Sequence, residues 1–382
     1  MKPQPLKGIR VVELARILAG PWCGQVLADL GAEVIKVEAP GGDDTRAWGP
    51  PFVERHGDRT AAYFYGCNRG KTSVTADFRN EDDLRYVKDL ISSCDVVIEN
   101  FKVGGLEKYG LDYASLSGTT PSLVYCSVTG FGQTGPRAKQ PGYDLLIQGM
   151  SGVMDITGDP EGAPQKMGVA FADIFSGLYA AIGIEAALLE RTRIGQGQHL
   201  DISLLDSMTG VLANQAMNYF ATGNSPKRGG NRHANLTPYE TIEASDGHII
   251  VAVGNDSQFK RFCTALDLQD ALGGPDYETN ALRLKHQEAM MAQINARSRQ
   301  FTKADLIAKL TQAGVPGGPI NTVEEALADP QIEHRKMRIS PEGLDGLRLP
   351  IVFSNAADAD TDAPAPAPTL GARINATTTW SS

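Results

Sequence analysis

The sequence predicts an α/β protein: a large domain with a parallel sheet covered by helices on both faces, and a smaller α/β domain. Two observations support this fold class. Over the first 130 residues, short runs rich in β-branched residues alternate with helical runs, the order that produces strand–helix–strand units. A polar, glycine-bearing segment at 222–237 then separates a second, shorter α/β stretch from the first.

The first half opens with a strand–helix–strand unit. A strand at 9–14 precedes a helix at 21–30, and Gly31 ends that helix before a strand at 33–38. The alternation continues with strands at 72–78, 95–101 and 122–129 and a helix at 81–94. Ligands of such sheets bind at the carboxyl ends of the strands. We therefore expect a site where the loops at 19–21, 100–101 and 130–135 meet.

The second half continues with helices and fewer strands. Its predicted elements, in chain order, are helix 174–195, strand 199–204, a helix reaching about 221, strand 248–254, and helices 256–268, 280–299 and 302–313. The tail at 356–368, built mostly of Ala, Asp and Pro, is predicted to be extended. The predicted parts are a large domain (first part, 1–205), a linker helix and active-site loop (206–237), a small α/β domain (238–328) and a return segment completing the large domain (329–382).

Composition restricts the class of partner and the compartment. The chain has 382 residues and a formal net charge of −9, so it lacks the basic excess with which proteins bind nucleic acids and anionic membranes. Its start has no apolar core like that of a signal peptide, and no uncharged stretch reaches membrane-spanning length, so we expect a cytoplasmic protein. The five scattered cysteines include no CxxC pair, and we expect them to be reduced thiols in the core.

One carboxylate stands at the start of the longest apolar helix. Asp173 lies between two apolar, glycine-bounded runs. At a helix N-terminus the free backbone N–H groups and the helix dipole favour an ionised carboxylate, which a nucleophile requires, and the same N–H groups can hold an oxyanion. The alternative is that Asp173 is an N-cap, the usual role of an aspartate in this place. The segment alone leaves both interpretations open.

Two other patterns bear on ligands. The letters of a dinucleotide fingerprint occur at 130–135, but Pro136 and Pro141 follow, so no helix starts at the third glycine and we expect no nicotinamide or flavin site. Histidine spacing predicts no metal site. Several basic residues gathered at one end of the sheet would form a phosphate-binding surface. Those in the loops of the first half are Arg16, Arg46, Arg69, Lys71, Arg79, Lys102, Lys108, Arg137 and Lys139.

Nearly the whole chain resembles the class III CoA-transferases, a family that includes formyl-CoA transferase, carnitine CoA-transferase and the α-methylacyl-CoA racemases. The resemblance rests on many short motifs in a fixed order. They include Leu18-Ala19-Gly20-Pro21, Asn68-Arg69-Gly70-Lys71, Glu99-Asn100-Phe101, Gly142-Tyr143-Asp144, Ala172-Asp173-Ile174-Phe175-Ser176-Gly177 and Gly195-Gln196-Gly197-Gln198.

The resemblance implies an enzyme that uses CoA as a substrate and has no tightly bound cofactor. Asp173 falls on the family's catalytic aspartate, which attacks an acyl-CoA thioester to give a mixed anhydride. The released CoA thiolate then forms an aspartyl-CoA thioester, and an acceptor carboxylate finally receives CoA. The resemblance also implies an interlocked homodimer, each protomer having a large Rossmann-like domain and a small domain.

The same resemblance implies which residues line CoA, and guanidinium chemistry suggests candidates for binding the acceptor. CoA would be lined by Leu18, Ala19, Ala76, Arg79, Asn100, Phe101, Lys108 and Tyr143. The distal carboxylate of an acceptor would pair with a guanidinium through a bidentate fork. The candidates for that pairing are Arg16, Arg228 and Arg232.

Departures from the family pattern separate its branches. Racemase members have a histidine where this chain has Tyr143, and a tyrosine exchanges α-protons poorly near neutral pH. The formyl-CoA transferase branch has a run of glycines where this chain has 228–238, and a basic residue at the position of Ala39. Segment 43–52 and Pro238-Tyr239 are similar to members that move CoA from succinyl-CoA to dicarboxylic acids such as glutarate. The alternatives are a racemase-like enzyme and a non-catalytic CoA-binding protein.

Overall fold

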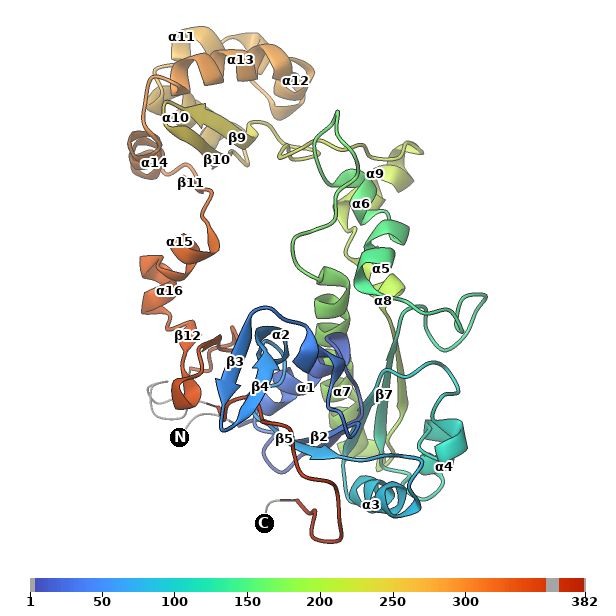
Figure 1. Ribbon diagram of the computed structural model, residues 1–382. Coiled ribbons are helices and arrows are strands. Elements are labelled where there is room, and N and C mark those ends of the chain that lie inside the picture. Colours follow the sequence, from blue (N-terminus) through green and yellow to red (C-terminus); the bar gives the residue numbers. More distant parts are fainter. Residues whose placement is uncertain (1–3, 355–363, 381–382) are drawn as a thin grey trace. The chain divides into compact units, whose positions relative to one another are not determined.

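The computed structural model describes residues 4–354 and 364–380 of the chain (Figure 1). The chain divides into two compact units. The first unit takes in the described parts of 1–153, 166–212 and 330–382, and the second takes in 154–165 and 213–329. Segment 154–165, inside the predicted large domain, is therefore part of the second unit. Of the tail predicted to be extended, 355–363 lies outside the described residues, and 364–368 forms neither helix nor strand.

The first unit is built on a six-stranded sheet whose neighbouring strands are all parallel. Across the sheet the strands are β5 (Lys71–Thr75), β2 (Glu33–Glu38), β1 (Arg10–Glu13), β6 (Val96–Glu99), β7 (Val124–Thr129) and β8 (His199–Ser203). The α/β class with a parallel sheet is thus confirmed. Strand order reverses between β1 and β6, as in doubly wound dinucleotide-binding folds, and such a reversal opens a crevice at the carboxyl ends of these two strands.

Helices cover both faces of this sheet, and alternate residues of β1 show why. Val11 packs into the core formed with one set of helices, and Val12 into the core on the opposite face. A strand buried on both faces reads as a continuous apolar run, which made β1 and its neighbours predictable. Helices α1 (Ala19–Asp29), α5 (Asp144–Met150), α7 (Phe171–Ile194) and α8 (Leu204–Gly210) belong to the first core, and α3 (Glu81–Ser92) and α4 (Tyr113–Ser117) to the second.

Local signals place the ends of these helices. Helix α1 has Pro21 in its first turn, where no backbone N–H is needed, and ends before Gly31, whose φ is +101°. Helix α3 is capped by the Asn80 side chain, which accepts the N–H groups of Asp82 and Asp83. Helix α7 ends at Gly195 in the left-handed conformation.

The first unit has smaller elements around the sheet. A hairpin of β3 and β4, which the sequence did not predict, follows β2. In the return segment, the carbonyl of Ala372 accepts the N–H of Thr75 in the edge strand β5, and the N–H of Ile374 donates to the Thr75 carbonyl. The remaining elements are η1 (Asp44–Ala47), β3 (Phe52–Arg55), β4 (Asp58–Ala61), α2 (Ala62–Tyr65), η2 (Glu107–Tyr109), α6 (Val153–Ile156, at the boundary between the units), α16 (Pro330–His334), β12 (Arg338–Ile339), η4 (Pro341–Gly343) and β13 (Gly346–Leu347).

The second unit packs helices on a three-stranded antiparallel sheet of order β11-β10-β9, around a core that includes Ile249, Phe262 and Leu306. Strand β10 and the helical stretches within 256–268, 280–299 and 302–313 were predicted, but β9, β11 and the short helices at 269–272 and 323–327 were not. The elements are α9 (Asn214–Thr222), β9 (Tyr239–Ala244), β10 (Gly247–Ala252), α10 (Asp256–Ala265), α11 (Gln269–Leu272), η3 (Pro275–Tyr277), α12 (Asn280–Lys285), α13 (Gln287–Ser298), α14 (Lys303–Gln312), β11 (Gly317–Pro319) and α15 (Val323–Leu327).

Two features of the apolar helices differ from expectation. The helix predicted to run to about 221 is broken, because Ala213 has a φ of +45° and separates α8 from α9. Among the described residues, α7 is long and apolar enough to pass a length-and-composition test for a membrane span. It lies beside α1 and contacts β7 and β8, which are the contacts of a core helix (Figure 1).

Candidate active site

A cavity of about 350 Å³ opens at the carboxyl ends of the central strands of the first unit. Its walls are the segments that follow β1, β6 and β7, the residues before α5, the first turn of α7 and the start of α8. Seven of the predicted site residues line it, and they come from four separate segments of the chain. They are Arg16, Leu18, Ala19, Asn100, Phe101, Tyr143 and Asp173.

Asn100 joins the two loops at the strand-order reversal. Its amide oxygen accepts the N–H of Arg16 at 3.0 Å, and its amide nitrogen donates to the Arg16 carbonyl at 2.7 Å. An amide side chain is suited to this because it offers a donor and an acceptor on one plane. Asn100 therefore fixes the loop after β1 against the loop after β6.

Asp173 is the third residue of α7 and not its N-cap. The helix begins at Phe171, and Ala170 occupies the N-cap position without a side-chain hydrogen bond. The N–H of Ala172 is instead bonded by the side chain of Asp144, at 2.9 Å. In the part of the chain that the structure describes, no hydrogen bond or ion pair reaches the carboxyl group or the backbone N–H of Asp173. The N-cap alternative is therefore wrong, and the carboxyl is free to meet a ligand.

The protonation of Asp173 also differs from expectation. We expected the helix N-terminus to hold the carboxyl in its ionised form. Burial in the cavity wall raises the pKa of Asp173, and the negative charge of Asp144 raises it further, to about 7. Desolvation and a like charge therefore favour the protonated carboxyl, and the ionised carboxylate that forms is poorly solvated and correspondingly reactive.

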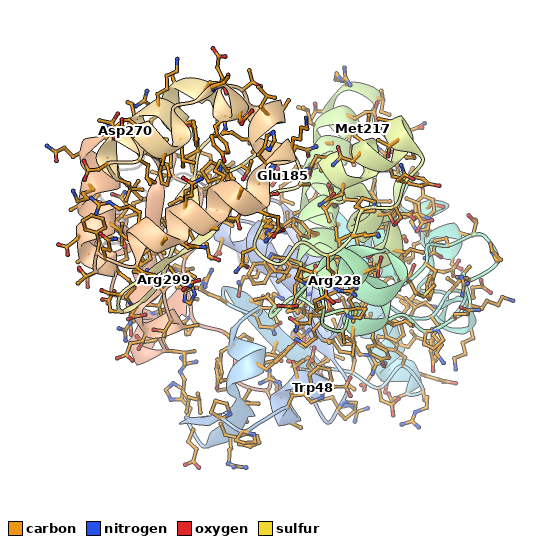
Figure 2. The ribbon with its side chains drawn as sticks, turned by 90° about the horizontal axis from the view of Figure 1, so that it is seen from above. Trp48, Glu185, Met217, Arg228, Asp270 and Arg299 are labelled. Carbon is orange, nitrogen blue, oxygen red and sulfur yellow. The ribbon has the colours of Figure 1, made fainter. Side chains whose placement is uncertain are left out.

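The sequence did not single out Tyr63 and Asp144 as site residues. Burial raises the pKa of the Tyr63 hydroxyl to about 12, and the nearby charge of Asp173 adds to the shift. The Tyr63 ring packs edge-on against Trp48, which is exposed and labelled in Figure 2, with ring centroids 5.3 Å apart. Asp144 belongs to the motif Gly142-Tyr143-Asp144, but nothing in the sequence indicates its bond to α7.

A second cavity, of about 290 Å³, shares Arg16 and Phe101 with the first. The predicted residues Ala76 and Arg79 line it. The Arg79 guanidinium is largely exposed and pairs with Asp77 at 2.8 Å. Lys108 lines neither cavity; it is exposed, with its ammonium 4.7 Å from the ring centroid of Tyr109, a residue of the second cavity wall.

The predicted phosphate-binding surface is smaller than expected. Three of its basic residues, Arg46, Arg69 and Lys71, are buried and paired with acidic side chains. Paired charges inside the domain do not offer a surface to a ligand. Their partners are Glu38 and Asp58 for Arg46, Asp29 for Arg69, and Glu13 for Lys71.

The predicted substrate arginines Arg228, labelled in Figure 2, and Arg232 lie in the second unit. The guanidinium of Arg228 donates to the carbonyls of Asp155, Asp159 and Gly162 and pairs with the Asp155 carboxylate at 3.3 Å. These bonds explain why segment 154–165 belongs to this unit. Arg232 pairs with Glu240 and Glu288, each at 3.4 Å.

The glycine pattern at 130–135 has a local role. No helix begins at Gly135, since α5 starts only at Asp144, as the sequence predicted. A Cβ on Gly130 would lie 2.5 Å from the Cα of Gly142, so the two backbones touch and bring Tyr143 beside the end of β7. Among residues 4–354 and 364–380, no group of three His, Cys, Asp or Glu side chains is placed to hold a metal ion.

Several known proteins are similar to this chain over most of its length. A succinate–glutarate CoA-transferase of Agrobacterium fabrum is 52% identical over 358 residues, 92% of this chain and 90% of that protein. A succinyl-CoA:glutarate CoA-transferase of Mus musculus is 40% identical over 332 residues, 87% of this chain and 75% of that protein. A crystal structure of a CaiB/BaiF family protein from Brucella suis is 56% identical, covers 97% of both chains and has a TM-score of 0.87.

The family match spans nearly the whole chain. The family described as CoA-transferase family III matches residues 6–374. The resemblance stated from the motifs is thereby confirmed. The chain belongs to CoA-transferase family III, and it is a class III CoA-transferase.

Proposed function

We propose that this enzyme transfers CoA from succinyl-CoA to a short dicarboxylate such as glutarate, with Asp173 as the nucleophile. The observation that supports the nucleophile is the position of its carboxyl group. It lines the cavity at the strand-order reversal, beside loops 16–19 and 100–105, with no hydrogen-bond partner in the described residues. The activities for which the Agrobacterium and mouse relatives are named support this choice of donor and acceptor.

The proposed reaction exchanges bonds at carbonyl carbons without net proton transfer. An Asp173 carboxylate oxygen attacks the thioester carbon, the C–S bond breaks, and CoA leaves as a thiolate from a mixed anhydride. The thiolate attacks the Asp173 carbonyl carbon and releases succinate, leaving an aspartyl-CoA thioester. Glutarate displaces the thiolate to form a second anhydride, and the thiolate then takes the glutaryl carbonyl and regenerates Asp173.

The two cavities suggest how CoA lies in the first unit. The thioester end would occupy the cavity that contains Asp173, between Leu18 and Tyr143. The phosphates would lie toward Arg79 and Lys108, whose exposed side chains can reach a charged ligand. Phe101 and Arg16 border both cavities and would contact the arm between these ends.

Arg16 is our candidate for the distal carboxylate of the acceptor. Its guanidinium is more than half exposed, at the border of the Asp173 cavity, and its pairing with Asp44 at 2.8 Å is exposed on both sides. An exposed pair of this kind contributes little to stability, so its exchange for a substrate carboxylate costs little. A bidentate guanidinium would favour a dicarboxylate over a monocarboxylate.

We also propose that the enzyme is a cytoplasmic homodimer with interlocked protomers. Along α7, apolar side chains are exposed in the single chain, and a second copy would bury them. These side chains are Leu178, Tyr179, Ile182, Leu189 and Ile194. The five cysteines are all free and buried, which suits a reducing compartment. Size-exclusion chromatography with light scattering tests the dimer, and a monomer at micromolar concentration contradicts it.

The function is tested with succinyl-CoA and a panel of carboxylates of increasing length, followed by mass spectrometry of the enzyme and the products. We expect a CoA adduct on the protein and acyl-CoA formation from glutarate. Asp173→Asn abolishes both. Asp270→Asn, the same chemical change at an exposed position (Figure 2), leaves both unchanged. Transfer that persists in Asp173→Asn contradicts the mechanism.

The same experiment separates the alternatives. Exchange of the α-proton of a 2-methylacyl-CoA in D₂O, without any acceptor, would indicate a racemase-like enzyme. Saturable CoA binding without an adduct on the wild-type protein would indicate a binding protein. Preference for a monocarboxylate in the wild type would contradict the role of Arg16.

A further inference from the structure

The turn that connects β1 to α1 has a strained residue at its centre. Ile17 has a φ of +71°. A β-branched side chain rarely adopts this left-handed conformation, because its Cβ crowds the backbone. Ile17 lines the cavity that contains Asp173, so the strain lies at the active site. A conformation of this kind persists only where surrounding contacts enforce it.

Two buried charged side chains hold this segment, which we call the 15–18 turn. The ammonium of Lys36 donates to the carbonyl of Ala15 at 2.8 Å, and the carboxylate of Asp43 accepts the N–H of Ile17 at 3.2 Å. The same ammonium pairs with Asp43 at 2.9 Å and with Glu13 at 3.0 Å. The three charged side chains are at most 1% exposed, and all three ammonium donors of Lys36 have a partner.

The charges of the buried pair are mutually dependent. Burial alone would lower the pKa of Lys36, but the carboxylates of Glu13, Asp43 and Glu38 raise it above its usual range. Burial alone would raise the pKa of Asp43, but Lys36 and the hydrogen bonds from Thr45 lower it. Both groups are therefore charged at neutral pH, and their bonds to the turn are charge-assisted.

The 15–18 turn determines where α1 begins. Leu18 and Ala19 follow the strained residue directly and line the Asp173 cavity. The carbonyl of Ala19 packs on α7 at Gly177, one helical turn after Asp173, so closely that a Cβ on Gly177 would lie 2.6 Å from its oxygen. A shift of the turn would therefore move the cavity wall that faces Asp173.

We propose that Lys36 and Asp43 are positioning residues for CoA transfer. Together they hold the 15–18 turn in its left-handed conformation and so keep Leu18 and Ala19 in place around the thioester that Asp173 attacks. Neither residue lines the cavity that contains Asp173, although both line the second cavity. The inference rests on the proposed function in one respect, namely that Asp173 is the nucleophile.

The first test is Asp43→Asn in the full-length enzyme. The rate constant for CoA-adduct formation with succinyl-CoA is measured in a single turnover, and the Kd for CoA is measured by calorimetry. We expect the rate constant to fall by about 10–100-fold, since small displacements of reacting groups have effects of this size, while the Kd rises less than about threefold. A folded Asp43→Asn enzyme with the wild-type rate constant overturns the proposal.

A double-mutant cycle with Ile17→Gly tests the cause of the loss. Glycine adopts a positive φ without the strain of isoleucine, so the turn depends less on Asp43 in that background. We expect Asp43→Asn to reduce the adduct rate constant less than about threefold when residue 17 is glycine. If Asp43→Asn reduced the adduct rate constant by the same factor in the wild-type and the Ile17→Gly enzymes, Asp43 would not act through the 15–18 turn, and the proposal would be overturned.

Asp29→Asn is the matched control for the loss of a buried ion pair. Asp29 pairs with Arg69 in the same unit and bonds to no residue of the 15–18 turn. We expect Asp29→Asn to lower the melting temperature and to leave the adduct rate constant unchanged. If Asp29→Asn reduced the rate constant as much as Asp43→Asn does, the proposal would be overturned.

Two other results are possible: the Asp43→Asn variant does not fold, or the wild-type enzyme forms no adduct. If Asp43→Asn does not fold, the double variant Lys36→Met with Asp43→Asn is used in its place in the double-mutant cycle, because it removes both buried charges together. We expect the adduct rate constant to fall by the same factors as those given for Asp43→Asn. If the wild-type enzyme forms no adduct, the proposed function fails, and that result differs from equal adduct rates in wild type and variant.

Discussion

The Asp144 side chain caps helix α7 by accepting the N–H of Ala172, and its negative charge raises the pKa of Asp173, which follows Ala172 in the helix. One oxygen of Asp144 accepts the Ala172 N–H at 2.9 Å, and the other accepts the amide of Gln148 at 2.7 Å. With burial as the larger cause, the pKa of Asp173 reaches about 7. The proposed nucleophile is therefore only partly ionised at neutral pH, and its cap is one of the reasons.

We predict that Asp144→Asn shifts the pH dependence of acylation. Only the Asp173 carboxylate attacks, so the wild-type rate rises with pH through about 7. Asparagine keeps an oxygen for the Ala172 N–H but removes the like charge, so the pKa of Asp173 falls and the acid limb moves to lower pH. Single-turnover adduct formation between pH 5 and 9 measures the limb. An unchanged limb would show that the two carboxyls do not interact.

We predict that Asp173 destabilises the free enzyme above neutral pH. The pKa of Asp173 is about 7 in the folded enzyme and 3.8 in the unfolded chain. The folded state therefore has its full stability below about pH 4, where the carboxyl is protonated in both states, and loses stability as the pH rises through 7, because the buried carboxyl resists ionisation. A shift of this size corresponds to about 4 kcal/mol at most. In urea unfolding, Asp173→Asn should be more stable than wild type at pH 8, and the difference should shrink toward pH 4. Asp270→Asn should show no such pH-dependent gain.

Much of the first unit could be predicted because its strands are buried on both faces. Val11 and Val12 pack into different cores. A strand buried on both faces has a continuous apolar sequence, which is easily recognised. The hairpin β3–β4 was missed because charged residues make up half of each strand, and β11 was missed because it consists of two glycines and a proline. Strand β9 was missed because one of its buried positions is the charged Glu240, so the alternation of buried Glu240, Ile242 and Ala244 with more exposed residues is not visible as an apolar pattern in the sequence.

The site could be predicted only as far as motifs extend. Asp173 was found because it lies in a contiguous motif, but its raised pKa arises from burial and from Asp144, and both depend on tertiary packing. Tyr63 was missed for the same reason, because more than a hundred residues of chain separate it from Asp173. The bonds of Lys36 and Asp43 likewise join β2 and the loop after it to the turn after β1, across more than twenty residues of chain, and leave no local pattern.

Glu99 should matter for CoA binding through the loop after β6. It is buried, its carboxylate accepts the N–H of Phe101 at 2.7 Å, and Phe101 lines both cavities. Glu99→Ala leaves that N–H without its partner, which should lower the free energy of unfolding by about 1–3 kcal/mol and raise the Kd for CoA several-fold. Glu99→Gln keeps a carbonyl acceptor and should bind CoA within about twofold of wild type. Equal Kd values for the two variants would contradict this role.

Helix α7 needs glycine at position 177, because the start of α1 lies against it. A Cβ there would lie 2.6 Å from the Ala19 carbonyl oxygen and 3.0 Å from Cβ of Trp22, and neither atom can rotate away. Gly177→Ala should therefore destabilise the enzyme by about 1–3 kcal/mol despite the better helix propensity of alanine. It should also slow adduct formation, because α1 carries Ala19 away from Asp173.

Gly183→Ala, in the same helix, is the control for this prediction. Its added Cβ would meet only a methyl group of Leu200, at 3.4 Å, which is ordinary contact with a flexible side chain. Its stability should stay the same or rise by up to about 1 kcal/mol, and its adduct rate should match the wild type. Thermal melts and single-turnover mass spectrometry on both variants measure these effects. If Gly177→Ala matched Gly183→Ala in both, the tight contact between α1 and α7 would not set the geometry around Asp173.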